Sequence, residues 1–193
     1  MRHDLTDLIP TRHGHFRFES GHHGNLWLDL DGLFRRSRRL RPFAEALASK
    51  LARHTVAVVC GPLVGGAFLA QTVADILDIE FCHAEPFVPD EREALYPVQY
   101  RLPVSIRSDV RGKAVAVVDD VVNAGSAVRG AYTALDECGA RVVAIGALVV
   151  LGTVAPVHFA ERGVPLERLA DWPNDLWDPT ACPLCAAGVP LAN

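Results

Sequence analysis

Residues 115–127 read VAVVDDVVNAGSA, an apolar run that ends in two acids and passes through a turn of small residues to a serine. The β-branched run predicts a buried strand, and the amphipathic stretch after it predicts a helix that begins near Ser126. A turn of Asn, Ala and Gly before a helix leaves backbone amides free at the positive end of the helix dipole, where anions bind. The stretch therefore predicts a strand, a phosphate-binding turn and a helix, the repeating unit of an α/β domain.

The two acids, Asp119 and Asp120, restrict what this turn can bind. Carboxylates would repel a bare phosphate, but they suit a ligand that also presents hydroxyl groups or Mg²⁺. A sugar phosphate combines these features. The alternative is that both acids only cap the turn. Their position at the carboxyl end of a buried strand, where open α/β sheets bind ligands, favours a binding role.

The rest of the chain repeats the alternation of strand and helix on both sides of this stretch. Apolar runs predict strands at 55–60, 113–119 and 142–151. Apolar periodicity predicts helices over 40–51, around a face of Leu69, Val73 and Ile76, and from 126 to a cap at Gly139. Pro42 is expected in the first turn of the upstream helix. Residues 84–109 hold four prolines and scattered charges, which predicts a long excursion from the sheet, such as a lid.

Composition excludes several classes of protein. The chain has 193 residues, half of them apolar, and a formal net charge of −4, so it does not favour nucleic acid or membranes as partners. No apolar run is long enough to span a membrane, and the polar N-terminus does not resemble a signal peptide, so we expect a cytoplasmic protein. The basic run Arg35–Arg41 is interpreted as a solvated loop and helix start rather than a nucleic-acid patch.

Three motifs resemble those of a known family. VAVVDDVVNAGSA resembles the 5-phosphoribosyl-1-pyrophosphate (PRPP) signature of type I phosphoribosyltransferases, and GPLVGGAFLA (61–70) is similar to that family's pyrophosphate loop. FRFESGHHGNLWLDLDGLF (16–34) looks like the N-terminal hood of the orotate phosphoribosyltransferase branch. The resemblance implies one α/β domain with a central parallel sheet flanked by helices. It would comprise a hood (1–40), a core (41–155) with a lid (84–109), and a C-terminal tail (156–193).

The resemblance also implies an activity, in which a nitrogenous base displaces pyrophosphate from PRPP with the help of Mg²⁺. Asp119 and Asp120 would be the catalytic acids that hold the ribose hydroxyls. The other implied site residues are Asn123, Ala124, Gly125, Ser126 and Ala127 for the 5-phosphate, Leu63, Val64, Gly65 and Gly66 for pyrophosphate, and Phe16, Arg17, Glu19 and His22 for the base. A homodimer that shares lid and hood is expected. The alternative function is a non-catalytic PRPP-binding regulator on the same fold.

The chain departs from the orotate branch where that branch carries basic residues. Glu19 stands in place of the hood lysine, the lid contains no lysine, and two further basic pairs are replaced around Cys82–Ala84 and Val150–Gly152. Arg92, Arg101 or Arg107 could supply positive charge from the lid. These losses argue against an anionic base such as orotate and leave a neutral base, an unusual substrate or a non-catalytic sensor.

The tail contains Cys182-Pro-Leu-Cys185, which resembles one half of a zinc knuckle. A structural zinc ion needs four ligands, and the chain has no second CxxC pair. The missing ligands could come from Cys60, Cys82, Cys138, a hood histidine or the tail of a partner subunit. The alternative is a reduced thiol pair. The hood histidines His13, His15, His22 and His23 are interpreted chiefly as polar surface, although His22 and His23 could face the active site.

Overall fold

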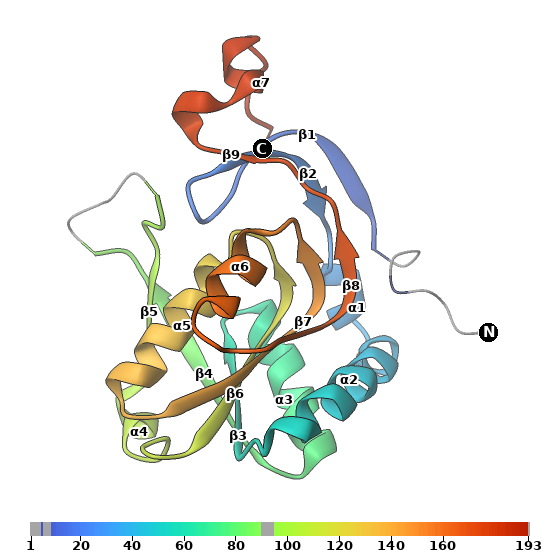
Figure 1. Ribbon diagram of the computed structural model, residues 1–193. Helices are drawn as coiled ribbons and strands as arrows, with labels where there is room; N and C mark the ends of the chain where they lie inside the picture. The colour runs from blue at the N-terminus through green and yellow to red at the C-terminus, as the bar shows by residue number, and fades with distance from the viewer. Residues whose placement is uncertain (1–4, 6–8, 90–94, 193) are drawn as a thin grey trace.

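A six-stranded, mostly parallel sheet forms the centre of the molecule in the computed structural model, which describes residue 5 and residues 9–89 and 95–192 (Figure 1). The strands lie in the order β5-β4-β3-β6-β7-β8, and only β5 is antiparallel to its neighbour. Their bounds are β3 (Val58–Pro62), β4 (Glu80–Phe87), β5 (Gln99–Arg101), β6 (Ala114–Val122), β7 (Arg141–Leu151) and β8 (Leu166–Trp172). The carboxyl ends of β3 and β6 therefore meet at one edge of the sheet.

Helices cover both faces of this sheet (Figure 1). The longer helices are α2 (Ser37–Leu51), α3 (Gly65–Leu77), α5 (Ser126–Glu137) and α6 (Val154–Ala160), and the short ones are α1 (Asp31–Phe34), η2 (Ala52–His54) and α4 (Val104–Arg107). Successive residues of β6 serve opposite cores, because side chains alternate along a strand. Ala116 and Val118 pack in the cluster with α2 and α3, whereas Val115 and Val117 pack in the cluster with α5 and α6. Burial on both faces explains why β6 reads as a continuous apolar run.

The predicted strands and helices of the core are present, with shifted ends. Helix α5 ends before Gly139, which has φ 76° and terminates the helix as predicted. The expectation for Pro42 is wrong: α2 begins at Ser37, within the basic run, so Pro42 lies beyond the first turn. Arg36 precedes that helix with extended backbone, and the basic side chains that follow it are exposed on the first turns of α2.

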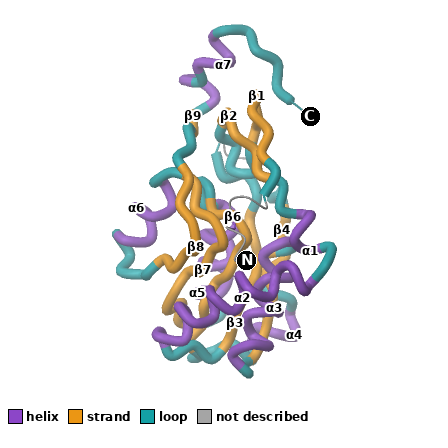
Figure 2. The backbone as a smooth tube through the Cα atoms, turned by 90° about the vertical axis from the view of Figure 1, so that its right-hand side faces the viewer, coloured by secondary structure: helices purple, strands orange, loops and turns teal. Residues whose placement is uncertain are grey.

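The N-terminal segment forms a separate small sheet above the core (Figure 2). It consists of β1 (Thr11–Arg17) and β2 (His23–Leu28), which pair in antiparallel fashion, and β9 (Leu176–Trp177), which adds to β2. Two short helices follow β9, namely η3 (Pro179–Ala181) and α7 (Pro183–Ala186). The C-terminal segment thus returns to the N-terminal hairpin. We use the name hood for this hairpin, which consists of β1, β2 and the 18–22 turn between them.

The segment expected as a tail divides between the two sheets. Its first part forms β8, which pairs with β7 in parallel, so the core extends beyond residue 155 to Trp172. The predicted lid begins as a continuation of β4 and returns as β5, with Glu85 opposite Arg101. Arg92, named above as a source of positive charge, lies outside the described residues. Among the helices that the structure describes, none is both long and apolar enough to cross a membrane.

Candidate active site

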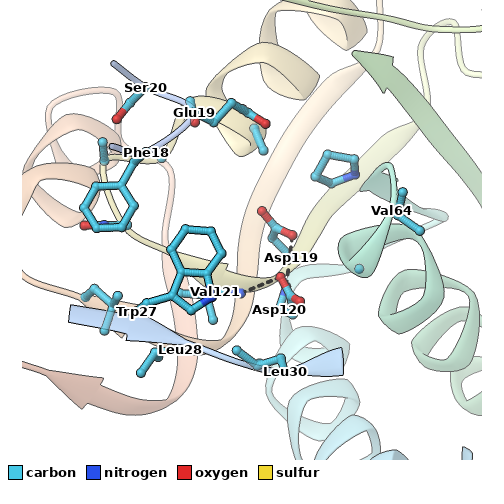
Figure 3. A pocket seen from close by; sticks show the side chains of 18 of the residues that line it. Phe18, Glu19, Ser20, Trp27, Leu28, Leu30, Val64, Asp119, Asp120 and Val121 are labelled. Atoms are coloured by element: carbon cyan, nitrogen blue, oxygen red, sulfur yellow. Dashed lines mark hydrogen bonds between the residues drawn. The ribbon is translucent and has the colours of Figure 1, made fainter. Parts of the chain in front are cut away.

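A cavity of about 390 Å³ opens where the carboxyl ends of β3 and β6 face the hood (Figure 3). Three segments enclose it: the loop after β3, the end of β6 with the turn into α5, and the hood with the start of α1. The described lining residues are Phe18, Glu19, Ser20, Leu26–Asp31, Pro62–Gly65, Tyr100, Asp119–Val121, Asn123–Ala127 and Leu151. Of the residues expected at the site, Asp119, Asp120 and those of both loops except Gly66 line this cavity, whereas Glu19 is the one expected hood residue among the described lining.

The turn before α5 has the form of an anion site. Gly125 precedes the helix with φ 82°, a left-handed conformation that glycine adopts without steric cost, and no side chain caps the helix. The amides of the first turn are consequently not taken up by a capping group, and they face the cavity at the positive end of the helix dipole. Asn123 accepts a hydrogen bond of 3.0 Å from Asn174, a residue between β8 and β9 that the sequence did not single out.

The acid pair Asp119 and Asp120 lies at the end of β6 on the cavity floor (Figure 3). Asp119 is buried, and its Oδ1 accepts the Asp120 amide at 3.0 Å; Asp120 Oδ1 accepts the Val121 amide at 2.8 Å. Burial, and then the neighbouring carboxylate, raises the pKa of Asp119 well above its usual value. Burial also raises the pKa of Asp120. Two adjacent carboxylates, one buried and one half-buried, suit a ligand that offers hydroxyl donors or a cation.

The loop after β3 reaches directly to this acid pair. A Cβ atom on Gly65 would lie 2.4 Å from Asp120 Oδ2, and one on Gly66 would lie 2.6 Å from Asp119 Oδ1. Only glycine allows the loop backbone to approach the carboxylates so closely. The Leu63–Val64 peptide bond in this loop is cis. The structure thus brings the predicted pyrophosphate loop and the predicted catalytic acids into contact, although 52 or more residues separate them in the sequence.

The hood contributes a different set of side chains from the one expected for the base. Of the four residues named, Glu19 lines the cavity, whereas Phe16, Arg17 and His22 are not among the described lining residues. Phe16 is buried beneath Trp27, and His22 contacts Ser20 and Tyr96. Arg17 and Glu19 do not belong to one strand, because β1 ends at Arg17 and the chain turns over 18–22.

Phe18 and Trp27 form the aromatic part of the hood wall. Their rings stack with centroids 6.2 Å apart and an interplanar angle of 9°. Tyr100 of β5, which the sequence did not indicate, donates a hydrogen bond of 3.0 Å to Glu19 Oε2 and so joins the lid to the hood. Its pKa is raised by burial and by the Glu19 carboxylate. This part of the wall is consequently aromatic.

The charge of the cavity lining is negative. Five of the described lining residues are acids, namely Glu19, Asp29, Asp31, Asp119 and Asp120, and none of the described ones is Lys, Arg or His. This charge suits a cation held together with a polyphosphate, since Mg²⁺ binds through a few carboxylates and phosphate oxygens. The predicted thiol ligands Cys182 and Cys185 lie elsewhere, beside His15 and His23 of the hood.

Comparisons with known proteins agree with this geometry. A family model described as a phosphoribosyl transferase domain matches residues 38–158. The chain is 32% identical to an orotate phosphoribosyltransferase of Thermotoga maritima, over 92% of this chain and 87% of that protein. It is 28% identical to an orotate phosphoribosyltransferase of Caldanaerobacter subterraneus, over 93% of this chain and 87% of that protein.

Solved structures show the same fold. An adenine phosphoribosyltransferase from Thermoanaerobacter pseudethanolicus superposes with a TM-score of 0.69 at 16% identity, covering 87% of this chain and 98% of that one. An orotate phosphoribosyltransferase from Aeropyrum pernix superposes with a TM-score of 0.63 at 23% identity, covering 83% and 87%. Relatives that act on different bases thus share this fold.

Proposed function

The chain belongs to the phosphoribosyltransferase family and is an enzyme of that class, and from this premise we propose how its cavity acts. The reaction is the transfer of the 5-phosphoribosyl group of PRPP to a nitrogenous base, with release of pyrophosphate. Membership of an enzyme family favours this function over a non-catalytic PRPP-binding regulator. The observation that supports the proposal is the close approach of Gly65 and Gly66 to the acid pair, since a polyphosphate at this loop would lie beside a ribose held by the two acids.

In this proposal each segment of the cavity holds one part of PRPP. Asn123–Ala127 hold the 5-phosphate through the uncapped amides of α5, and Leu63–Gly66 present backbone amides to the pyrophosphate. Asp119 and Asp120 accept hydrogen bonds from the ribose 2- and 3-hydroxyls. These contacts would align the anomeric carbon between the base and the leaving pyrophosphate.

The chemistry follows from this alignment. A base nitrogen forms a bond to the anomeric carbon while the bond from that carbon to pyrophosphate breaks, and positive charge develops on the sugar. The proton of the base N–H passes to the solvent or to the departing pyrophosphate. The carboxylates of the acid pair stabilise that charge, and the amides of the 63–66 loop stabilise the negative charge that accumulates on the leaving group. Mg²⁺, which the acidic lining and a polyphosphate would hold together, supplies further neutralisation of the pyrophosphate.

Two classes of base are candidates. The negative lining favours a base without a carboxylate, because a carboxylate about 4 Å from Glu19 would be repelled by on the order of 4 kcal/mol before screening by salt. The names of the relatives favour orotate instead. We propose a neutral base, since Tyr100 already donates to Glu19 and the described lining offers no cation to pair with a carboxylate.

The test measures pyrophosphate release from PRPP and Mg²⁺ with orotate, uracil, hypoxanthine and adenine in turn. We expect a neutral base to be used at least about 100-fold better than orotate, in keeping with a repulsion of several kcal/mol. Efficient turnover of orotate alone would refute the neutral base and retain the transferase. Absence of release with every base would contradict the catalytic proposal itself.

A paired substitution tests the acid pair separately. Asp119→Asn with Asp120→Asn should lower kcat/KM by about 100-fold or more, since charge stabilisation of a transition state is lost. The circular dichroism spectrum should be unchanged. Asp136→Asn on the exposed face of α5 is the matched control and should keep wild-type activity. Equal calorimetric affinity of the wild type and the double variant for PRPP would show that the ribose lies elsewhere.

We also propose that the protein is a cytoplasmic homodimer. All five cysteines are free in the structure, as is usual in a reducing compartment. Support for a dimer comes from the resemblance to the orotate branch and from Val64 and Phe68, which are 62% and 51% exposed and lie one helical turn apart. Apolar side chains that adjoin on a surface commonly mark an interface.

A further inference from the structure

We propose that the hood and the C-terminal tail together bind one structural Zn²⁺ ion through His15, His23, Cys182 and Cys185. The ligand atoms of these four side chains all lie within 4.8 Å of one another. They come from four places in the chain, namely β1, β2 and the two ends of the CPLC turn. None of the four lines the active-site cavity, so this site is distinct from the proposed magnesium and PRPP site.

Four of the six distances between the ligand atoms are close to those around a tetrahedral zinc ion, and the longest distance in the set is 4.8 Å. With ordinary zinc–nitrogen and zinc–sulfur bond lengths, tetrahedral geometry puts two nitrogens about 3.3 Å apart, nitrogen and sulfur about 3.6 Å apart, and two sulfurs about 3.8 Å apart. His15 Nε2 lies 2.9 Å from His23 Nδ1, 3.5 Å from Cys182 Sγ and 3.7 Å from Cys185 Sγ. Cys185 Sγ lies 3.3 Å from His23 Nδ1. Two thiolates and two imidazoles around one point select zinc over magnesium or calcium, which prefer oxygen.

The surroundings of His15 prepare it as a ligand. Its Nδ1 donates a hydrogen bond of 2.7 Å to the carbonyl of Val189, which fixes the tautomer and leaves the Nε2 lone pair free to face the cluster. His15 is 2% exposed and occupies a bulge of β1, where the register with β2 shifts between His13 and Phe16. A bulge re-aims a side chain, and here it turns His15 toward the tail while Phe16 is also buried.

Few buried apolar side chains hold residues 173–192 of the tail in place, although the Ala192 amide donates to the His15 carbonyl at 2.6 Å and Asn25 donates to Asp175 at 3.1 Å. Between residues 173 and 192 the structure describes one buried residue, and that residue is Cys182. Strand β9 has two residues and α7 has four, and α7 lies at the far end of the molecule from the core (Figure 2). A segment without an apolar core of its own needs a covalent or metal link to become fixed. A closed site with four protein ligands supplies that link, and it leaves no open position for catalysis.

The zinc ion would therefore fasten the C-terminus to the hood. When it binds, the two thiols lose their protons to the solvent and become thiolates. The hood hairpin that carries His15 and His23 also carries Phe18 and Trp27 in the cavity wall. The ion thus acts on the active site only through the position of this wall.

The first experiment measures metal content. The full chain, without an affinity tag and purified in the presence of reductant, should contain close to one zinc ion per chain by mass spectrometry of the metal. Cys185→Ser should lose this zinc, whereas Cys138→Ser, a partly buried cysteine outside the cluster, and His13→Ala, an exposed hood histidine, should retain it. Zinc absent from the wild type, or retained equally by Cys185→Ser, would overturn the proposal.

The second experiment uses only the wild-type chain, so its result does not depend on whether a variant folds. Wild type stripped with a chelator should take up added Zn²⁺, become more resistant to proteolysis in the tail, and unfold at a higher temperature. Added Co²⁺ should give the visible spectrum of a tetrahedral thiolate complex. Failure of stripped, reduced protein to bind either ion would refute the site. A Cys182–Cys185 disulfide found in protein purified without reductant, with no zinc taken up after reduction, would do so too.

Discussion

At the scale of single residues, the active site depends on two positions that carry no side chain. Gly65 and Gly66 begin α3 against the acid pair, and a side chain on either would collide with a carboxylate oxygen. Within a helix, alanine is normally more stable than glycine by about 0.5–1 kcal/mol, so helix propensity gives no reason for glycine here. The glycines are therefore explained by the close approach to Asp119 and Asp120 and not by helix stability.

Gly65→Ala should separate these two effects. Because the added Cβ would lie 2.4 Å from Asp120 Oδ2, the carboxylate must move, and we expect kcat/KM to fall by about 100-fold with little change in melting temperature. Gly32→Ala, at a helical glycine with no atom within 4 Å of the added Cβ, is the matched control and should leave kcat/KM unchanged. Wild-type activity in Gly65→Ala would contradict the assigned loop geometry.

At the scale of elements, α5 and α6 meet through a neutral histidine. His158 of α6 accepts hydrogen bonds at Nδ1 from the guanidinium groups of Arg129 and Arg162. Burial, followed by the charges of these two arginines, lowers the pKa of His158 from 6.5 to about 4. Protonation of His158 would bring three positive charges together between α5 and α6.

This contact predicts an acid-sensitive helix pair. Because the pKa of His158 is lower in the folded chain than the ordinary 6.5, the unfolded chain binds the proton first. The contribution of His158 to stability is therefore complete above about pH 6.5 and is lost as the pH falls toward about 4. Urea unfolding at pH 7 and pH 5 should show a larger loss of stability for wild type than for His158→Gln. Equal losses in the two proteins would contradict the prediction.

At the scale of the whole molecule, three parts of the chain that are distant in sequence enclose one cavity. The core supplies the floor, the hood supplies the aromatic wall, and the Tyr100–Glu19 hydrogen bond joins the lid to the hood. The lid also reaches the hood through the Tyr96 amide, which donates to the Ser20 carbonyl at 2.8 Å. On the side of α3, Val64 and Phe68 remain exposed within one chain, which is the face we assign to the dimer.

Light scattering at micromolar concentration should give twice the mass of one chain. Phe68→Glu, which puts a charge on the exposed apolar face of α3, should shift this mass toward that of a single chain. Val104→Glu is the matched control, because Val104 is 79% exposed on α4 and should not affect assembly. A single-chain mass for wild type would contradict the dimer, and an unchanged mass for Phe68→Glu would place the interface elsewhere.

The sequence by itself determined the parts whose cause is local. The apolar runs, the turn chemistry of 123–126 and the acids at the end of β6 predicted the strands, the helices and the floor of the site, because strand period, helix period and glycine conformation are properties of short segments. The close approach of Gly65 and Gly66 to the acid pair follows from the parallel pairing of β3 with β6, which brings the carboxyl ends of both strands together.

Only the tertiary structure decided the features that depend on contacts between segments far apart in the sequence. Phe16, Arg17 and His22 are not among the described lining residues, since a turn follows Arg17, and the predicted tail contains β8 and β9 because those strands pair with strands far away in sequence. His15 and Cys182 are 167 residues apart, and no local pattern distinguishes His15 and His23 from the other hood histidines. The bulge in β1 and the pairing of β9 with β2 bring them to the CPLC turn, since sheet pairing fixes which distant side chains share a face.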